Sequence, residues 1–254
     1  MVGYSLGGMV AIKLAALQPG RVLSLAIISS SLGGWHTIPL SLKAYRYVLS
    51  AMRDPRPATR AHVDLKFHFS RQTRKAWVRK TGWEGSQGCT LHAAVTPTRC
   101  ARASHPTPPL TSLLIPQLGD RKQSRHEVLH EEYVTTQAVQ TPQPLHAAAG
   151  QRSAYWSHSL SRAEADRIVA ARIPTLCLHG RHDLVVRVST AQKLAAMLHA
   201  PLVIMGAAHF LPRECGHEVN LFLESLILGQ ARQAERAHLD PSRHLASQVD
   251  VLRG

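Results

Sequence analysis

The residues with the clearest chemical meaning stand at the start of the chain, where Gly3-Tyr4-Ser5-Leu6-Gly7 matches the pattern G-x-S-x-G. A serine on a tight turn from a strand into a helix has strained backbone angles and projects its hydroxyl from the sheet edge. The N–H of the next residue points to where an oxyanion would form. The pattern predicts Ser5 as a nucleophile and Leu6 as an oxyanion-binding residue. Because it arises by chance in roughly one sequence in ten, the surrounding elements must support it.

A second polar cluster, with the letters HGRHD, ends at Asp183 and directly follows a short apolar run at 174–179. Ligands and catalytic groups gather at the carboxyl ends of parallel strands. Asp183 is therefore a candidate for the carboxylate that orients a histidine. Without the other motifs, a solvated loop aspartate or a helix-capping aspartate explains it equally well.

A third cluster, with the letters GAAHF, follows the apolar run at 201–205 and contains His209. Small residues before a histidine allow its ring to swing over a neighbouring strand end, so His209 is the candidate general base. The chain has 16 histidines, and one histidine alone proves little. His217 is the nearest rival, but it falls within the pattern of the final helix and is expected at the surface.

Alternating helix and strand patterns surround the three clusters. Helix formers followed by short, almost continuous apolar runs are typical of helices beside strands buried on both faces, and they indicate a parallel sheet and an α/β fold. The expected elements are helices at 8–17, 162–171, 189–198 (with Ser189 as N-cap) and 216–228, and strands at 22–29, 174–179 and 201–205.

The middle of the chain is less regular. Turn and breaker signals without periodicity fill about forty residues, which is uncommon inside a compact domain, so we expect a partly disordered insertion there. Helix-compatible patterns with many basic residues lie at 40–52 and 60–80. A further helical pattern lies at 125–138, and 141–152 is another loose stretch. The expected units are a core part at 1–34, a helical cap at 35–161 with the insertion at 82–124, a second core part at 162–228 and a flexible tail at 229–254.

Together, the three clusters give the order Ser5, Asp183, His209, each after a successive expected strand, which is the order of the α/β-hydrolases and not of other serine triads. The chain resembles this family at 3–31 and 162–228. The segments GYSLGGMVA, PTLCLHGRHDLVV and GAAHF…HEVN look like those of general, non-lipase serine hydrolases of bacteria and plants. The segments at 53–70 and 127–134 resemble, more faintly, cap segments of plant-type members. The resemblance implies Ser5 as the nucleophile, His209 as the base and Asp183 as the carboxylate partner of His209. A serine at the turn argues against epoxide hydrolases and haloalkane dehalogenases, which carry Asp there.

The same resemblance implies an N-terminally truncated chain. In the family the serine turn follows the fifth strand of eight, so the expected sheet is a stump of that strand plus strands six to eight. The loop that supplies the second oxyanion N–H would be absent, and losing one such donor costs ~10²–10³ in rate. The open sheet edge would favour aggregation. Two explanations stay open: Met1 is an internal methionine of a longer protein, or the chain is a shortened product without activity.

Composition narrows the classes of protein to which this chain could belong. Of 30 Lys+Arg residues, 14 fall between Arg53 and His126 against 4 Asp+Glu, so most of the net charge of +14 lies in one block. No helix-turn-helix, zinc-finger or aromatic–basic motif accompanies it, which disfavours a nucleic-acid-binding protein. No apolar run is long enough to span a membrane, and the four cysteines show neither a disulfide framework nor the C-x-x-C pairs of a zinc site.

Three functional interpretations follow. The first is a serine hydrolase that cleaves a small-molecule ester, thioester or amide, with the basic segment 53–79 forming a cap that favours acidic acyl groups. The second is a non-catalytic fragment of hydrolase ancestry, and the third is a basic nucleic-acid-binding protein. No metal or organic cofactor is implied, and the oligomeric state stays open. Localisation stays open, because any targeting peptide would lie upstream of a truncated chain, and the cysteine usage favours a reducing compartment, cytoplasmic or organellar. A signal peptide at the start of this sequence is disfavoured by Lys13 and by the lack of a basic leader.

Overall fold

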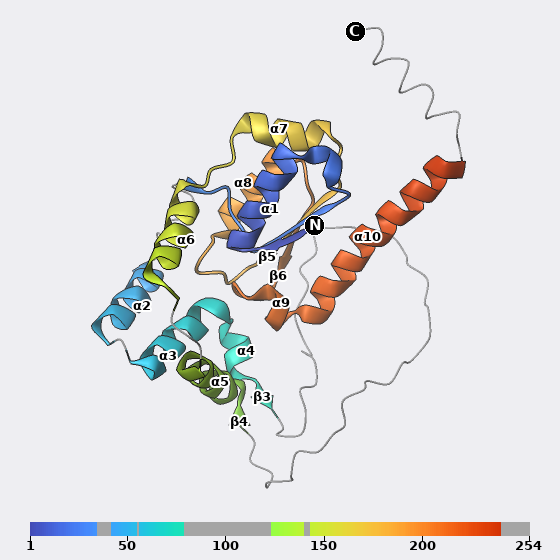
Figure 1. Ribbon diagram of the computed structural model, residues 1–254. Coiled ribbons are helices and arrows are strands. Elements are labelled where there is room, and N and C mark those ends of the chain that lie inside the picture. The colour runs from blue at the N-terminus through green and yellow to red at the C-terminus, as the bar shows by residue number, and fades with distance from the viewer. Residues whose placement is uncertain (35–41, 55, 79–122, 140–142, 240–254) are drawn as a thin grey trace.

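A sheet of four parallel strands, in the order β1-β2-β5-β6, forms the centre of the protein. The computed structural model describes residues 1–34, 42–54, 56–78, 123–139 and 143–239 (Figure 1). The strands are β1 Val2–Tyr4, β2 Leu25–Ile28, β5 Thr175–Gly180 and β6 Leu202–Met205. The expected parallel α/β sheet is thereby confirmed, with the four predicted strands in adjacent positions.

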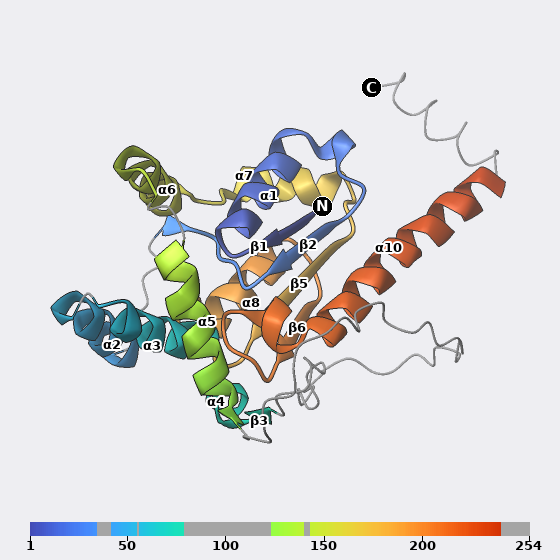
Figure 2. The same cartoon turned by 60° about the horizontal axis from the view of Figure 1, so that its bottom comes forward.

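Helices connect the strands and cover both faces of the sheet (Figures 1 and 2). One face carries α1 Leu6–Leu17, α7 Arg162–Ala170 and α8 Val188–Met197. The opposite face carries α10 Gly216–Leu239, whose Phe222, Leu223 and Leu226 pack against the sheet. A parallel sheet must be covered on both faces, because its strands are apolar on both sides.

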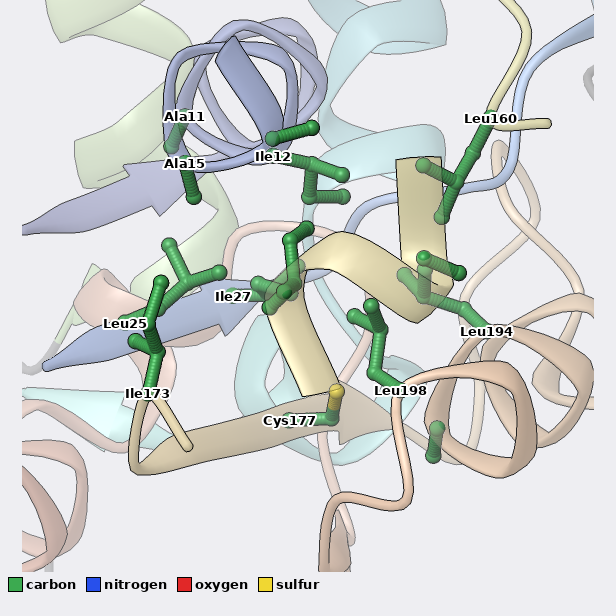
Figure 3. Packing of buried hydrophobic residues seen from close by; sticks show 14 of the residues in the cluster. Ala11, Ile12, Ala15, Leu25, Ile27, Leu160, Ile173, Cys177, Leu194 and Leu198 are labelled. Atoms are coloured by element: carbon green, nitrogen blue, oxygen red, sulfur yellow. The ribbon is translucent and has the colours of Figure 1, made fainter. Parts of the chain in front are cut away.

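The larger core cluster lies between the sheet and α1, α7 and α8 (Figure 3). Side chains of successive strand residues point to opposite faces, so Ile27 belongs to this cluster and Ile28 to the one beneath α10. An ion pair of Lys13 Nζ with Glu164 Oε1 at 2.6 Å joins α1 to α7 outside the apolar layer. The Lys13 hydrogen bond lowers the pKa of Glu164 to about 2, so this carboxylate stays charged near neutral pH.

A group of helices lies beyond the carboxyl ends of the strands, between β2 and β5 in the sequence (Figures 1 and 2). We call the helices α2 to α5 the cap. Leu65 and Phe69, from the end of α3, and Leu129 of α5 form its small apolar core. The elements in this part of the chain are α2 Leu42–Arg53, α3 Pro57–His68, α4 Arg71–Lys75, β3 Trp77–Val78, β4 Gln123–Ser124, α5 Arg125–Val139 and α6 Leu145–Ser157.

Several predicted elements differ from the structure in this region. The helix expected at 60–80 is two helices, because α3 starts at Pro57 and Ser70 interrupts the run and caps α4 through its side chain. The stretch at 141–152, predicted to be loose, contains most of α6 instead. Its alanines favour a helix, and Gly150 within it only weakens that preference. The insertion expected at 82–124 lies outside the described residues except for Gln123–Ser124.

Two further predictions about helix ends are wrong. The final helix does not stop at 228 but continues to Leu239, because Gly229 is tolerated inside a helix and strong helix formers follow it. Helix α8 starts at Val188 with Arg187 as its N-cap residue, so Ser189 lies inside the helix and does not cap it. The flexible tail expected at 229–254 is therefore helical up to Leu239, and residues 240–254 lie outside the described part.

Strand β1 is an edge of the described sheet, as the sequence led us to expect. Val2 of this strand is 53% exposed. The neighbouring helix α1 also exposes apolar side chains, at Val10, Leu14 and Leu17. Their spacing of four and three residues places them on one face of the helix. The edge of the sheet and this face of α1 thus form an exposed apolar surface.

Candidate active site

Ser5 stands in a strained conformation on the turn between β1 and α1. Its φ of 51° and ψ of −120° lie where non-glycine residues are rare. Its N–H donates to the carbonyl of Ile28 at 2.9 Å, and its own carbonyl accepts from Ser30 Oγ at 2.8 Å. Such a conformation costs about 1–3 kcal/mol and persists only where the surroundings hold it. The neighbouring strand β2 and the residues after it supply these holding contacts.

The glycines of the motif allow α1 to approach the sheet closely. A Cβ at Gly3 would lie 2.6 Å from the carbonyl oxygen of Gly7 and from Cα of Gly8. A Cβ at Gly8 would lie 2.6 Å from Cβ of Ser30. Real Cβ atoms do not come that close to other heavy atoms, so any larger residue would push the helix and the turn apart. Gly7 differs, because a Cβ there would meet nothing within 4 Å.

His209 joins Ser5 to Asp183. Its Nε2 lies 3.0 Å from Ser5 Oγ, and its Nδ1 lies 2.8 Å from Asp183 Oδ2. The histidine is only 4% exposed, and it stands in the loop between β6 and the short helix α9 Leu211–Glu214. The three residues that the sequence singled out, from segments far apart in the chain, thus form one hydrogen-bonded series.

The Asp183 carboxylate is fixed on both oxygens. Oδ1 accepts from the N–H groups of Val185 at 2.7 Å and Val186 at 2.8 Å, which leaves Oδ2 facing His209. Because His209 Nδ1 faces an acceptor, it must carry a proton, and Nε2 is then free to accept the proton of Ser5. His179 lies beneath this loop. Burial lowers the pKa of His179, so it is neutral and donates from Nε2 to the carbonyl of Val186.

Leu6, the predicted oxyanion-binding residue, is the first residue of α1. Its N–H has no hydrogen-bond acceptor within the described part of the chain. An unpaired N–H beside the nucleophile at a helix N-terminus suits a developing negative charge. The rival histidine, His217, is exposed on α10.

A comparison with protein-family profiles matches residues 1–222 of the chain to the alpha/beta hydrolase fold. The chain belongs to the alpha/beta hydrolase fold family. The match covers the serine turn, the cap and both loops that carry Asp183 and His209. The expected family is therefore confirmed. Among curated protein sequences, none matches this chain significantly.

Solved structures share the alpha/beta hydrolase fold with this chain at low sequence identity. All three named below are under 20% identical to it, so the likeness shows the fold alone, and the chain spans less than two thirds of each one's length. A 2-hydroxy-6-oxo-6-phenylhexa-2,4-dienoate hydrolase from Rhodococcus sp. strain RHA1 matches with a TM-score of 0.53 and 15% identity, over 89% of this chain and 62% of that one. A meta-cleavage product hydrolase from Pseudomonas fluorescens IP01 matches with a TM-score of 0.54 and 16% identity, over 90% of this chain and 64% of that one. A hydrolase from Pseudomonas aeruginosa PA01 matches with a TM-score of 0.51 and 18% identity, over 91% of this chain and 63% of that one.

Aromatic and imidazole rings surround the histidine of this alpha/beta hydrolase. Tyr4 lies 5.4 Å from His209 and Phe210 stacks on Tyr4 at 5.5 Å, both measured between ring centroids. From the cap, His68 stacks on His209 at 6.4 Å and its Nδ1 lies 2.8 Å from the Tyr133 hydroxyl. Burial is the main cause that lowers the pKa of His68 to about 4, so this ring is neutral near neutral pH.

Sequence reasoning missed these rings. Tyr4 lies inside the serine motif, so its place beside the site could have been foreseen from the motif itself. His68 and Tyr133 stand in helical patterns that carry no chemical signal, and only the packing of α3 and α5 brings them near His209. Glu214 was missed for the same reason. Its buried carboxylate joins the His209 loop to the cap, and it is described further below.

A hollow of about 350 Å³ lies beside the loop that carries Asp183, and not at Ser5. Its lining residues are Arg71, Gln72 and Lys75 of α4 and His182 of the loop. No acidic side chain of the described residues pairs with Arg71 or Lys75. In the described residues, no three His, Cys, Asp or Glu side chains are grouped as metal ligands would be. None of the described helices combines the length and low polarity that crossing a bilayer requires.

Proposed function

We propose that this chain carries the catalytic centre of a serine hydrolase that cleaves carboxyl esters, thioesters or amides through an acyl-enzyme. The observation that carries the proposal is the series Ser5 Oγ, His209 and Asp183, linked at 3.0 and 2.8 Å on a strained turn. Nucleophile, base and orienting acid in mutual hydrogen-bond reach are what this chemistry requires. The solved hydrolases of the same fold are consistent with it.

In the proposed reaction, Ser5 Oγ attacks the carbonyl carbon of the substrate while its proton passes to His209 Nε2. Asp183 keeps the proton on Nδ1 and stabilises the imidazolium that forms. The N–H of Leu6 donates to the oxyanion. His209 then gives its proton to the leaving oxygen, sulfur or nitrogen, and the acyl group stays on Ser5. Water, deprotonated by His209, attacks this acyl-enzyme, and His209 then returns the proton to Ser5 Oγ as the acyl–oxygen bond breaks and the acid leaves.

We further propose that the small-molecule substrate carries an anionic group. The basic hollow beside the Asp183 loop supports this, because Arg71 and Lys75 lie one helical turn apart on α4 in its lining, and no acidic side chain of the described residues pairs with either. Arg71→Gln and Lys75→Gln should raise KM for an ester with a carboxylate on its acyl chain. They should leave KM for a neutral ester of equal length unchanged. Equal changes for both esters would contradict the preference.

The alternative is that this chain is a non-catalytic member of the family. It is favoured by one observation, the identity of only 15% to the Rhodococcus hydrolase with which the chain shares its fold, because a shared fold does not imply a shared activity. The two hypotheses differ in whether Ser5 is reactive.

Labelling with a fluorophosphonate tests the reactivity of Ser5 directly. The probe phosphonylates a serine only when a base removes its proton, so the intact chain should be labelled at Ser5, as read by mass spectrometry of the tryptic peptide. Ser5→Ala should abolish labelling, and His209→Gln should reduce it strongly. Ser189→Ala, which changes an exposed serine of α8, should keep it. A folded chain that is labelled no faster than its Ser5→Ala variant would support the non-catalytic alternative.

A further inference from the structure

Glu214 is a buried carboxylate that the proposed reaction does not use. It ends helix α9, is 4% exposed and accepts hydrogen bonds from three residues. Ser70 N–H donates to both oxygens, at 3.1 and 3.0 Å. Thr73 Oγ1 donates to Oε2 at 2.6 Å, and Ala208 N–H donates to Oε1 at 2.6 Å. A buried carboxylate needs such donors, because burying an unsatisfied charge is very costly.

The donors to Glu214 come from two different parts of the molecule. Ser70 and Thr73 belong to the cap, where the chain leaves α3 and begins α4. Ala208 belongs to the core and is the residue directly before His209. The carboxylate therefore bridges the cap and the loop that holds the base. All its hydrogen-bond donors are neutral groups, and no cation of the described residues lies within ion-pair distance, although Arg74 and Arg125 attract it electrostatically.

Two neighbouring contacts strengthen the same junction. The N–H of Phe210, directly after His209, donates to the carbonyl of His68 at 2.8 Å. Arg213, directly before Glu214, pairs with Glu132 of α5. The chain on both sides of His209 is thus bound to the cap. Displacing the cap from the core would either break these bonds or move the loop.

We propose that Glu214 is a positioning residue that couples the position of the cap to that of His209. The inference rests on the proposed function, because the distance it protects is the 3.0 Å between His209 Nε2 and Ser5 Oγ. A displacement of about 1 Å in a reacting group can cost ~100-fold in rate. A substitution at a cap residue that donates to Glu214, away from Ser5, then lowers kcat and does not act on substrate affinity alone.

Thr73 offers a matched pair of variants on the cap side. Thr73→Val keeps the shape of the side chain but removes the hydrogen bond to Glu214, together with the one that Thr73 Oγ1 accepts from Ser70 Oγ, whereas Thr73→Ser keeps the hydroxyl that makes both. The expected result is a fall in kcat of about 5-fold to 10-fold for Thr73→Val, as one lost hydrogen bond of ~1 kcal/mol allows. KM should stay unchanged, and Thr73→Ser should restore kcat. Glu214→Gln should lower kcat by about 100-fold, because its NH₂ group would face N–H donors.

A second readout separates this inference from the proposed function. The His209 Nδ1 proton, bound to Asp183, gives an NMR signal that is identified by its loss in His209→Gln. It should broaden in Glu214→Gln and Thr73→Val, and stay sharp in Thr73→Ser, whether or not the chain turns over an ester. If the chain is inert but this signal responds, the proposed function fails and the coupling stands.

Three outcomes would overturn the coupling. In the first, Thr73→Val and Glu214→Gln lower the melting temperature but leave the His209 signal and the labelling rate of folded protein unchanged, so Glu214 is only structural. In the second, KM alone rises, so the cap acts only through substrate contacts. In the third, Thr73→Ser fails to restore what Thr73→Val loses, so the hydroxyl bond to Glu214 is not the cause.

Discussion

The rings of His68 and His209 stack with their centroids 6.4 Å apart, although one ends a cap helix and the other follows the last strand of the sheet. Burial and, secondarily, the charge of His209 lower the pKa of His68 from 6.5 to about 4. A neutral His68 does not repel the imidazolium that forms on His209 during catalysis. The same shift makes the folding stability depend on pH.

Stability should fall in mild acid, and His68 should be one cause. The unfolded chain protonates His68 below pH 6.5, whereas the folded chain does so only at about 4. The unfolded state therefore binds more protons in this window, so the stabilisation is complete above pH 6.5 and is lost as the pH falls to about 4. His68→Asn, which keeps a partner for Tyr133 but does not titrate, should show a smaller loss of unfolding free energy. Urea unfolding near both ends of this pH window measures the unfolding free energy of each variant. His217→Asn, on an exposed residue, is the control and should match the unmodified chain.

Asp183→Asn should remove most of the activity without unfolding the chain. The amide can still accept from Val185 and Val186, but its NH₂ group would face Nδ1 of His209. That geometry favours the wrong imidazole tautomer, and the expected loss in kcat is ~10³–10⁴. Ester hydrolysis and fluorophosphonate labelling both measure it. Arg181→Gln changes an exposed residue of the same loop that does not line the basic hollow, and a comparable loss there would refute the assignment.

Alanine should have opposite effects at two glycines of the serine motif. At Gly3 it places a Cβ 2.6 Å from backbone atoms of Gly7 and Gly8, and the overpacking should destabilise the fold by about 1–3 kcal/mol. At Gly7 a Cβ meets nothing within 4 Å, and helix propensity alone should stabilise α1 by about 0.5–1 kcal/mol. Denaturant unfolding of both variants tests the contrast. Equal destabilisation would show that the close approach of α1 is not what requires glycine.

The exposed apolar surface beside β1 should make this 254-residue chain self-associate. Val10, Leu14 and Leu17 are 53%, 47% and 64% exposed on one face of α1, beside the sheet edge. Exposed edges and apolar patches promote association. Changing all three residues to Gln should lower the scattered-light mass measured at equal protein concentration. Leu23→Gln, at an 84% exposed residue outside this face, should not. A chain that is monomeric before any substitution would contradict the prediction.

Local patterns in the sequence were sufficient to predict the core. Apolar runs such as 174–179 indicated buried strands, and the serine turn and the two strand-end clusters placed Ser5, Asp183 and His209 at one edge of the sheet. This works because parallel strands end on the same side, so residues just after them converge wherever the sheet forms. Errors arose at helix limits, as at Leu239, where propensity and packing outweigh a single glycine.

The sequence by itself determined the order of the elements, the strained turn at Ser5 and the types of the three reacting groups, because these depend on neighbours in the chain. Only the tertiary structure decided what surrounds them. Glu214 receives hydrogen bonds from Ser70 and Thr73, more than a hundred positions away in the chain, and His68 reaches His209 across a comparable separation. Such contacts have no period or spacing to reveal them, because they arise from how the cap docks on the ends of the strands.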